Sequence, residues 1–429
     1  MSDFSPAEAT SATHPDPEVS VRANEGASKR YFLGTHRTCA PQETLARLRP
    51  LLPAMGITRI ANVTGLDRTG IPVVMVCRPN ARSVAVSQGK GLTLDGAKAS
   101  GVMEAVEVWH AEHIVKPLVL ATLEEMRREH RVVDVALLPL ASGSRFSPDL
   151  TLLWIEGNDI LGGDAVWVPF ELVSTNYTLP LPPGSGCFQA NTNGLASGNH
   201  PVEAISHGLC EVVERDATTL WRVQSPRSRA ERVIDPETID DSGCQSILEQ
   251  LRAANLAVRI WETTSDLGIA SFVCLVTEVE GEYADPEFGA GCHPARGVAL
   301  LRALTEAAQA RNTYISGARD DYPSDAWEAG YRRRRQVFCQ TLMTSLKPRR
   351  SFAHVPNFDS PTLEADLRWL LARLRSGGIA QVVSVDLSKE AIGIPVVRVV
   401  VPGLEGAMED AGGNYAPGPR AKRVARADA

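Results

Sequence analysis

The chain has 429 residues, of which 44% are hydrophobic and 22% are charged, and this is the composition of a folded globular protein. Its formal net charge of −7 argues against a general nucleic-acid binder. No apolar run reaches the roughly 18–20 residues that cross a bilayer, and the polar N-terminus lacks the basic start and apolar core of a secretory signal. We therefore expect a cytoplasmic protein whose partners include neither nucleic acid nor membrane.

The eight cysteines are scattered along the chain, and none of them forms a C-x-x-C pair. A structural zinc site usually needs such pairs, so the sequence does not favour one. Several cysteines lie inside apolar runs, for example Cys274 in the run 271–276. This pattern predicts reduced, buried thiols.

The hydrophobic pattern divides the chain into helical and strand-like segments separated by turn residues. In the first half it predicts a helix over 40–55, strands over 57–63 and 71–78, a glycine-bearing loop at 87–91, a helix over 95–113, and strands over 150–156 and 165–173. In the second half it predicts a glycine-bearing loop at 193–199, an acidic helix over 201–216, a helix over 244–254, strands over 257–263 and 269–279, a glycine-bearing turn at 289–294, helices over 295–316, 324–346 and 362–375, and strands over 380–387 and 395–401.

This order mixes strand pairs with helices, so we expect an α+β fold rather than a repeating βαβ fold. No low-complexity linker interrupts residues 30–415, which predicts one large domain of mixed sheets and helices. Residues 1–29 are polar and are expected to form a disordered tail. Residues 416–429 are rich in arginine and proline and are expected to form a basic mobile tail.

Three glutamates share one stripe of the expected helix over 201–216. At about 100° per residue, Glu203, Glu211 and Glu214 fall within roughly 80° of one another, with His207 between them. Like charges at this spacing repel, so the stripe faces either water or a cation. The loop at 193–199 leads into the helix N-terminus, where phosphates bind. Carboxylates beside a phosphate site indicate a Mg-nucleotide, because Mg²⁺ takes oxygen ligands from both.

Two further helices repeat the arrangement of a glycine-bearing segment followed by acidic residues. Glu104 and Glu107 are three residues apart on one helix face, and Lys90 precedes them between two glycines that would let the backbone approach a phosphate. This segment is not a Walker A loop, because Val84 stands where that motif needs glycine. On the third helix, Arg302 and Glu306 are four residues apart and are expected to form an ion pair.

The ordered set of these motifs resembles the YcaO superfamily over roughly residues 30–415. The motifs are Ser87-Gln88-Gly89-Lys90-Gly91, Glu104-x-x-Glu107, Asn193-Gly194-x-Ala196-x-Gly198-Asn199, Glu203-Ala204, Gly208-Leu209-x-Glu211-x-x-Glu214-Arg215 and Thr305-Glu306-Ala307-Ala308-Gln309-x-Arg311. YcaO proteins are ATP-dependent enzymes that phosphorylate a peptide amide oxygen, after which a nucleophile replaces the phosphate. The resemblance thus implies ATP and Mg²⁺ as cofactors and a precursor peptide or protein as substrate.

Residue roles follow from the resemblance, motif by motif. It implies that the Mg²⁺ ligands are Glu104, Glu107, Glu203, Glu211 and Glu214. It also implies catalytic roles for the three on the expected helix over 201–216, Glu203, Glu211 and Glu214. It implies nucleotide or phosphate contacts from Ser87, Lys90, Asn199, Glu306, Gln309 and Arg311. Phosphoryl transfer needs positioning and charge neutralisation more than covalent groups, which suits this set.

The product is a separate question from the ATP chemistry. The segments 35–38, 56–59 and 64–67 look like those of YcaO proteins that work with a TfuA partner, which is linked to sulfide delivery and thioamide formation. Azoline-forming members usually end in Pro-x-Pro-x-Pro, whereas this chain has Pro417-Gly418-Pro419-Arg420 followed by a basic stretch. We therefore expect a thioamide-forming enzyme with a TfuA-like partner and a sulfide source, and the resemblance leaves homodimer formation open.

Three alternatives stay open at this point. An azoline-forming cyclodehydratase would share every ATP residue and differ only in the nucleophile. A non-catalytic scaffold could keep an ATP-like pocket for binding a partner. A di-iron carboxylate site would use Glu-x-x-His pairs, and the chain offers Glu107-x-x-His110, but Glu203 and His207 have the wrong spacing.

Overall fold

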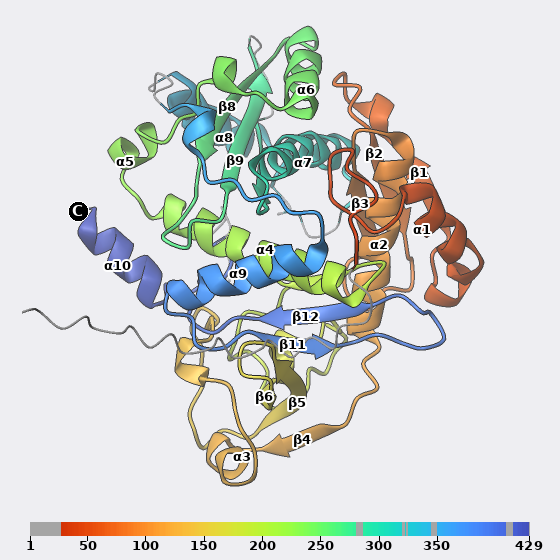
Figure 1. Cartoon of the computed structure of the whole chain (residues 1–429), viewed down its shortest axis with the longest axis vertical. Helices are drawn as coiled ribbons and strands as arrows, with labels where there is room; N and C mark the ends of the chain where they lie inside the picture. Colours follow the sequence, from red (N-terminus) through yellow and green to blue (C-terminus); the bar gives the residue numbers. More distant parts are fainter. Residues whose placement is uncertain are drawn as a thin grey trace, which may run out of the picture.

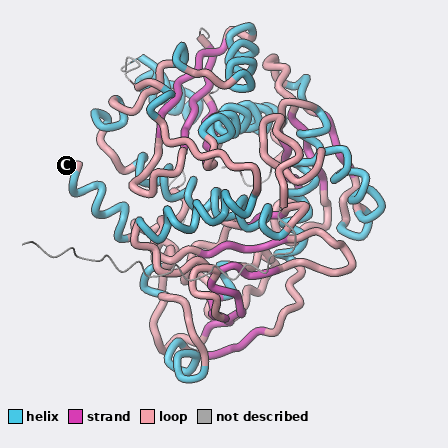
Figure 2. The backbone as a smooth tube through the Cα atoms, in the orientation of Figure 1, coloured by secondary structure: helices cyan, strands magenta, loops and turns pink. Residues whose placement is uncertain are grey.

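The computed structural model describes residues 27–279, 286–319, 322, 325–344, 350–408 and 415–428. The expected disordered tail at residues 1–29 falls almost wholly outside these residues. The strands of the three sheets pair in antiparallel fashion, which a repeating βαβ fold does not do, and Figure 2 shows helices lying around these strands, so the α+β prediction is confirmed. None of the described helices is long and apolar enough to cross a membrane.

Two antiparallel three-stranded sheets each carry one long helix. The first consists of β1 (Arg59–Asn62), β2 (Val73–Cys77) and β3 (Val86–Lys90), and α2 (Leu94–Glu112) packs on β3 and β2. The second consists of β8 (Leu256–Glu262), β9 (Ser271–Glu278) and β10 (Glu287–Cys292), and α7 (Arg296–Ser316) packs on β10 and β9. The two units thus have the same layout of a hairpin pair and a covering helix.

The third sheet has six strands, in the order β4-β5-β11-β12-β7 with β6 paired to β5. Its strands are β4 (Leu118–Ala121), β5 (Leu152–Asp159), β6 (Ala165–Pro169), β7 (Leu195–Ser197), β11 (Val383–Asp386) and β12 (Val396–Val400). The acidic helix α4 (Pro201–Arg222) packs on β12 and β7, with α9 (Leu363–Ser376) beside it (Figure 1). Because α4 also contacts β10 and β9, it joins this sheet to the second unit.

Two glycine-bearing segments that the sequence predicts as loops are strands. Residues 87–91 fall mostly in β3 and residues 289–294 mostly in β10, so both predictions were wrong. A Cβ on Gly89 would lie 1.9 Å from the carbonyl oxygen of Ala97, and one on Gly289 would lie 2.2 Å from that of Ala303. These glycines let a strand lie directly against a helix backbone, and phosphate approach is not their structural reason.

The remaining elements are shorter or lie at the periphery. The α-helices are α1 (Pro41–Leu48), α3 (Leu123–Glu129), α5 (Pro226–Ala230), α6 (Ser242–Ala253), α8 (Ala329–Thr344) and α10 (Pro419–Ala427), and short 3₁₀ turns occupy 49–51, 53–55, 64–66, 135–137, 170–172, 236–238 and 352–354. The prediction that residues 416–429 form a mobile tail was wrong, because residues 419–427 form α10. Its Arg420 is buried and pairs with Asp216 of α4.

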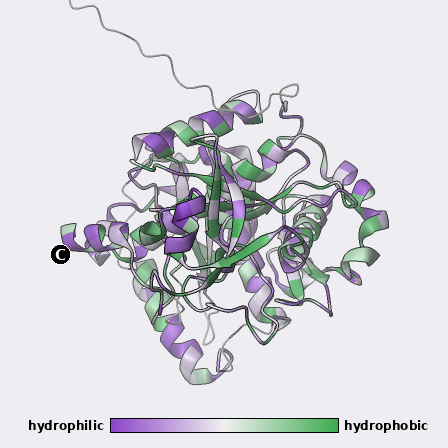
Figure 3. Cartoon of the chain, turned by 90° about the horizontal axis from the view of Figure 1, so that it is seen from below, coloured by the Kyte–Doolittle hydropathy of each residue, from purple (hydrophilic) through white to green (hydrophobic). Residues whose placement is uncertain are grey.

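Hydrophobic residues concentrate on the strands inside the molecule, and the outer helices show both polar and apolar faces (Figure 3). Four clusters of buried side chains form the core, and the largest lies between α2 and the sheets that contain β2 and β5. All eight cysteines are free, and six are buried, in line with the prediction of reduced thiols. The core therefore needs no covalent link to hold the three sheets around α4.

Candidate functional site

The three acidic helices α2, α4 and α7 line one cavity of about 860 Å³. This volume lies near the upper end of the roughly 300–1,000 Å³ that is usual for ligand sites. Most of the predicted site residues line the cavity: Lys90, Glu104, Glu107, Asn199, Glu203, Glu211, Glu214, Glu306 and Gln309. Segments more than 200 residues apart thus bring six carboxylates to one place.

The two glutamates of α2 lie in a strongly desolvated position. Glu107 accepts hydrogen bonds from the backbone nitrogen of Ser197 at 2.8 Å and from its hydroxyl at 2.6 Å. Glu104 accepts one from the backbone nitrogen of Gln88 at 3.4 Å. Burial raises the pKa of Glu104 to about 7 and that of Glu107 to about 8. Since burial penalises the charged forms, a bound cation would stabilise both carboxylates.

On α4, Glu203 is the most fully bonded carboxylate of the stripe. It accepts hydrogen bonds from the backbone nitrogen and the hydroxyl of Thr38 at 3.1 and 2.9 Å, and from Arg37 Nη1 at 3.3 Å. Burial raises the pKa of Glu211, and it raises that of Glu214 to about 7 with the charge of Glu306 as the next cause. The stripe therefore combines one carboxylate, Glu203, whose oxygens are well hydrogen-bonded, with two, Glu211 and Glu214, whose negative charge is not fully balanced by nearby donors and cations.

Cations reach the cavity from β3 and α7. Lys90 forms an ion pair with Glu306. Burial alone would raise the pKa of Glu306, but the positive charges of Lys90 and Arg215 outweigh it, so the pKa of Glu306 is lowered. The expected pair between Arg302 and Glu306 does not form. Arg302 instead lies 3.3 Å from Nδ1 of His207 and donates to the carbonyl of Cys292.

Two of the predicted nucleotide contacts are not among the residues that line the cavity. Ser87 is buried in β3, where its neighbours Gln88 and Lys90 point to the opposite face and line the cavity. Arg311 donates from Nε to Asp67 at 2.9 Å and from Nη2 to Glu278 at 2.8 Å. Because these carboxylates hold the guanidinium in a buried network, Arg311 ties α7 to the first unit.

Three residues at the site have no role predicted from the sequence. Arg37 and Thr38 lie in a segment that served only as a subfamily marker, yet they bind Glu203. Ser197 lines the cavity and binds Glu107. No periodic pattern identifies these three residues, because each acts through contacts between elements that are distant in sequence.

The residue set fits Mg²⁺ and a nucleotide. Mg²⁺ prefers carboxylate and phosphate oxygens, and six glutamates surround the cavity while Lys90 and Arg302 supply positive charge for phosphates. The sequence matches the family model described as YcaO cyclodehydratase, ATP- and Mg²⁺-binding, over residues 88–405. The chain belongs to the YcaO family. ATP and Mg²⁺ are its cofactors.

Relatives and solved structures agree with this assignment. The chain is 36% identical to a protein in the tfuA 3′ region of Rhizobium leguminosarum bv. trifolii, over 86% of this chain and 88% of the relative. It is 35% identical to a protein of Methanothermobacter thermautotrophicus, over 85% of this chain and 94% of the relative. Neither relative has a characterised activity.

Two solved structures share the fold. The structure of YcaO from Methanopyrus kandleri bound with AMPPCP and Mg²⁺ superposes with a TM-score of 0.71 at 23% identity, covering 90% of this chain and 99% of that chain. A heterocyclase in complex with substrate and cofactor gives a TM-score of 0.74 at 23% identity. This chain covers 54% of that heterocyclase, so the two share only part of the longer protein.

Proposed function

We propose that this protein uses ATP to activate a backbone amide of a ribosomally synthesised peptide or protein, and that the product is a thioamide. The amide oxygen takes the γ-phosphoryl group of ATP and ADP leaves, and sulfide then replaces phosphate at the amide carbon. The observation that carries the proposal is the convergence of six glutamates from α2, α4 and α7 on one cavity.

The side chains have separate parts in this reaction. Glu104, Glu107, Glu203, Glu211 and Glu214 would hold Mg²⁺, which when bound neutralises the charge that phosphoryl transfer develops. Lys90, Gln309 and Asn199 line the cavity and would orient the nucleotide. Thr38 and Arg37 fix the carboxylate of Glu203, and Ser197 fixes that of Glu107. Such preorganisation is the main contribution a protein makes to phosphoryl transfer.

The gene context of one relative supports a thioamide rather than an azoline product. That relative is a protein in the tfuA 3′ region, which supports a TfuA-like partner that delivers sulfide. Azoline formation is the second candidate, because a heterocyclase shares the fold and the family model bears the name cyclodehydratase.

The mass of the product distinguishes the two candidates. The precursor peptide is co-expressed with this protein and its TfuA-like partner, and the intact mass is measured. Replacement of oxygen by sulfur raises the mass, whereas cyclodehydration lowers it by one water. Only water loss, with sulfide present, would overturn the thioamide proposal.

Variants of the acidic stripe test the ATP chemistry and the scaffold alternative. Glu211→Gln should abolish ATP-dependent product and weaken Mg-ATP binding, because it removes a negative charge from the cavity without changing the side-chain volume. Glu249→Gln is the matched control, since Glu249 is an exposed glutamate on α6. Unchanged turnover in Glu211→Gln would exclude the metal assignment, and a wild-type protein that binds Mg-ATP without turnover would favour the scaffold.

A further inference from the structure

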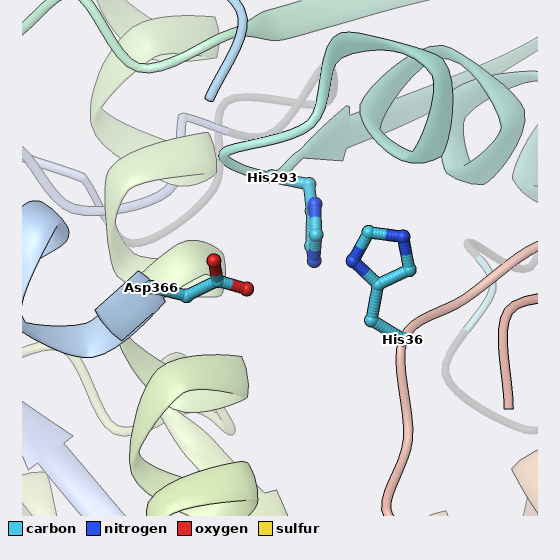
Figure 4. Close-up of side chains that lie close together, drawn as sticks. All are labelled: His36, His293 and Asp366. Atoms are coloured by element: carbon cyan, nitrogen blue, oxygen red, sulfur yellow. The ribbon is translucent and has the colours of Figure 1, made fainter. Parts of the chain in front are cut away.

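A cluster of two histidines and an aspartate lies outside the cavity. Nitrogen atoms of His36 and His293 and an oxygen of Asp366 all lie within 4.8 Å of one another, and the three side chains come from three separate segments (Figure 4). Such a set could hold a metal ion. However, His293 Nδ1 accepts a hydrogen bond from the backbone nitrogen of Ala295 at 3.0 Å, so in the neutral ring Nε2 carries the proton and cannot be a ligand.

The cation of this cluster is Lys29. Its buried ammonium lies 2.8 Å from an oxygen of Asp366 and 3.0 Å from one of Asp359. Burial and the charge of Lys29 lower the pKa of His36 to about 4, so the ring stays neutral at neutral pH. The cluster therefore works as an anchor that fastens the segment around Lys29 and His36 to α9 and to the start of α7.

The anchored segment forms a tight hairpin at the edge of the cavity. Tyr31 and Arg37 exchange backbone hydrogen bonds of 3.1 and 3.0 Å. Gly34 at the tip has φ +75°, and a Cβ there would lie 2.9 Å from Leu301 of α7. Because the tip is pressed against α7, the side chain of Leu33 is held along the cavity wall.

Leu33 is 53% exposed although it lines the cavity. Among the described residues, Leu33 and Met408 are the two large hydrophobic side chains that are exposed and also line this cavity. Phe32 is exposed to the same degree, 55%, but it does not line the cavity. Exposed apolar side chains at a cavity with a charged lining would be covered by an apolar ligand group.

Helix α4 runs between the two segments that carry these side chains. The hairpin binds the first turn of α4 through Glu203, and Met408 is held near its last turns by Thr219, whose hydroxyl accepts from the Met408 backbone nitrogen at 3.2 Å. At about 1.5 Å per residue the 16 intervening steps span about 24 Å. An extended chain covers this span in about seven residues, with Glu211 and Glu214 between its ends.

We propose that the cavity binds its peptide in an extended conformation along α4, with one apolar side chain against Leu33 and another against Met408. The reacting amide then lies near the acidic stripe, between the two apolar contacts. This inference rests on the proposed function, since it takes the substrate to be a peptide. It adds the class of sequence that the enzyme selects: apolar residues on both sides of the modified amide, about seven positions apart.

Binding of synthetic probes tests this inference. The first probe is a fluorescein-labelled peptide of about nine residues, otherwise Gly and Ser, with leucines about seven positions apart, the separation at which an extended strand covers the span of α4. The second has serine in place of both leucines, and the third has the leucines about two positions apart. Fluorescence anisotropy of the full chain with Mg-ATP should show the first probe binding at least about tenfold more tightly than the others, since burial of one leucine accounts for about that factor.

Matched variants locate the contacts. Leu33→Ser and Met408→Ser should each reduce the preference for the first probe several-fold, whereas Phe32→Ser and Leu179→Ser should leave it unchanged, because Phe32 and Leu179 are exposed but do not line the cavity. Equal affinity of the wild type for all three probes, or an equal effect of Phe32→Ser and Leu33→Ser, would overturn the inference.

A nucleotide titration separates this inference from the proposed function. Mg-ATP affinity, measured by calorimetry on the same variants, should not change. If Leu33→Ser weakens Mg-ATP binding and leaves the probe preference intact, Leu33 belongs to the nucleotide site and the inference fails. If Mg-ATP binds and the probes show the preference but no precursor is modified, the proposed function fails instead.

Discussion

Arg420 of the C-terminal helix donates to both carboxylate oxygens of Asp216, from Nε at 2.9 Å and from Nη2 at 3.0 Å. Asp216 lies two residues after Glu214, which places the two side chains roughly 200° apart around α4. The face of α4 opposite the glutamates is thus fastened to α10 by a buried, bidentate ion pair. This pair fixes the rotation of the helix that carries Glu211 and Glu214.

Arg420→Met should lower the free energy of unfolding by about 3 kcal/mol, because it leaves the buried carboxylate of Asp216 without its partner. Urea titration followed by circular dichroism measures the change. Lys422→Met, at an exposed position of the same helix, is the control and should change stability by less than about 0.5 kcal/mol. Equal stability of the two variants would mean that α10 does not fasten α4.

Glu107→Gln should stabilise the protein at pH 8 when Mg²⁺ and ATP are absent. Burial raises the folded-state pKa of Glu107 from 4.5 to about 8. Between these pH values Glu107 ionises in the unfolded chain but stays protonated in the folded one, so the folded state loses stability progressively as the pH rises. Glutamine keeps an oxygen for both Ser197 donors without the charge. We expect a gain of about 2 kcal/mol or more at pH 8, since one pKa unit corresponds to about 1.4 kcal/mol.

The pH dependence of this gain is the diagnostic result. Thermal unfolding in EDTA should show the gain shrinking as the pH falls toward 5, where Glu107 is protonated in the wild type. Added Mg-ATP should reverse the order of stability, because it binds the charged form. A gain that is the same at pH 5 and pH 8 would contradict the assignment of Glu107 as a desolvated carboxylate.

Arg311→Met should change stability, whereas Lys90→Met should change nucleotide binding. Arg311 belongs to a buried network with Asp67 and Glu278, so its loss should cost about 3 kcal/mol of stability and leave the Kd for Mg-ATP unchanged below the unfolding temperature. Lys90 lines the cavity, so its loss should raise the Kd for Mg-ATP about tenfold or more. Calorimetric titration of both variants measures the Kd for Mg-ATP. Weakened nucleotide binding in Arg311→Met would mean that Arg311 belongs to the nucleotide site after all.

Gly89→Ala should destabilise the protein by about 3 kcal/mol, because the added Cβ would lie 1.9 Å from the carbonyl oxygen of Ala97 and would push β3 away from α2. Gly65→Ala is the matched control, since nothing lies within 4 Å of a Cβ there. Chemical unfolding of both variants gives the comparison. If Gly89→Ala unfolds like the wild type, β3 does not pack as closely as described.

Local patterns in the sequence located most helices. The expected helices over 95–113 and 295–316 differ from α2 and α7 by at most one residue at each end, because long proline-free stretches rich in helix-forming residues can be recognised locally. The same is true of the glutamate stripe on α4, since its angular spacing follows from helix geometry alone. The α+β class follows from the order of these elements.

Short strands and the partners of single side chains could not be predicted in this way. Strand β3 ends in Gly89 and Lys90 and is followed by Gly91, a pattern typical of a loop, and the strand exists because α2 packs directly against Gly89. Arg311 carries a family motif position, but Asp67 and Glu278 decide its role. The sequence after residue 416 suggests a mobile tail, but pairing with Asp216, 204 residues away, makes Arg420 a buried anchor.

The sequence alone determined that the acidic residues exist, that they sit on helix faces, and that they fit a nucleotide-dependent family. The tertiary structure decided which of them meet, which cations neutralise them, and which side chains stay exposed at the cavity. The reason is that helix periodicity is a local property of the backbone, whereas burial, pKa shifts and ion pairing depend on groups brought together from distant parts of the chain.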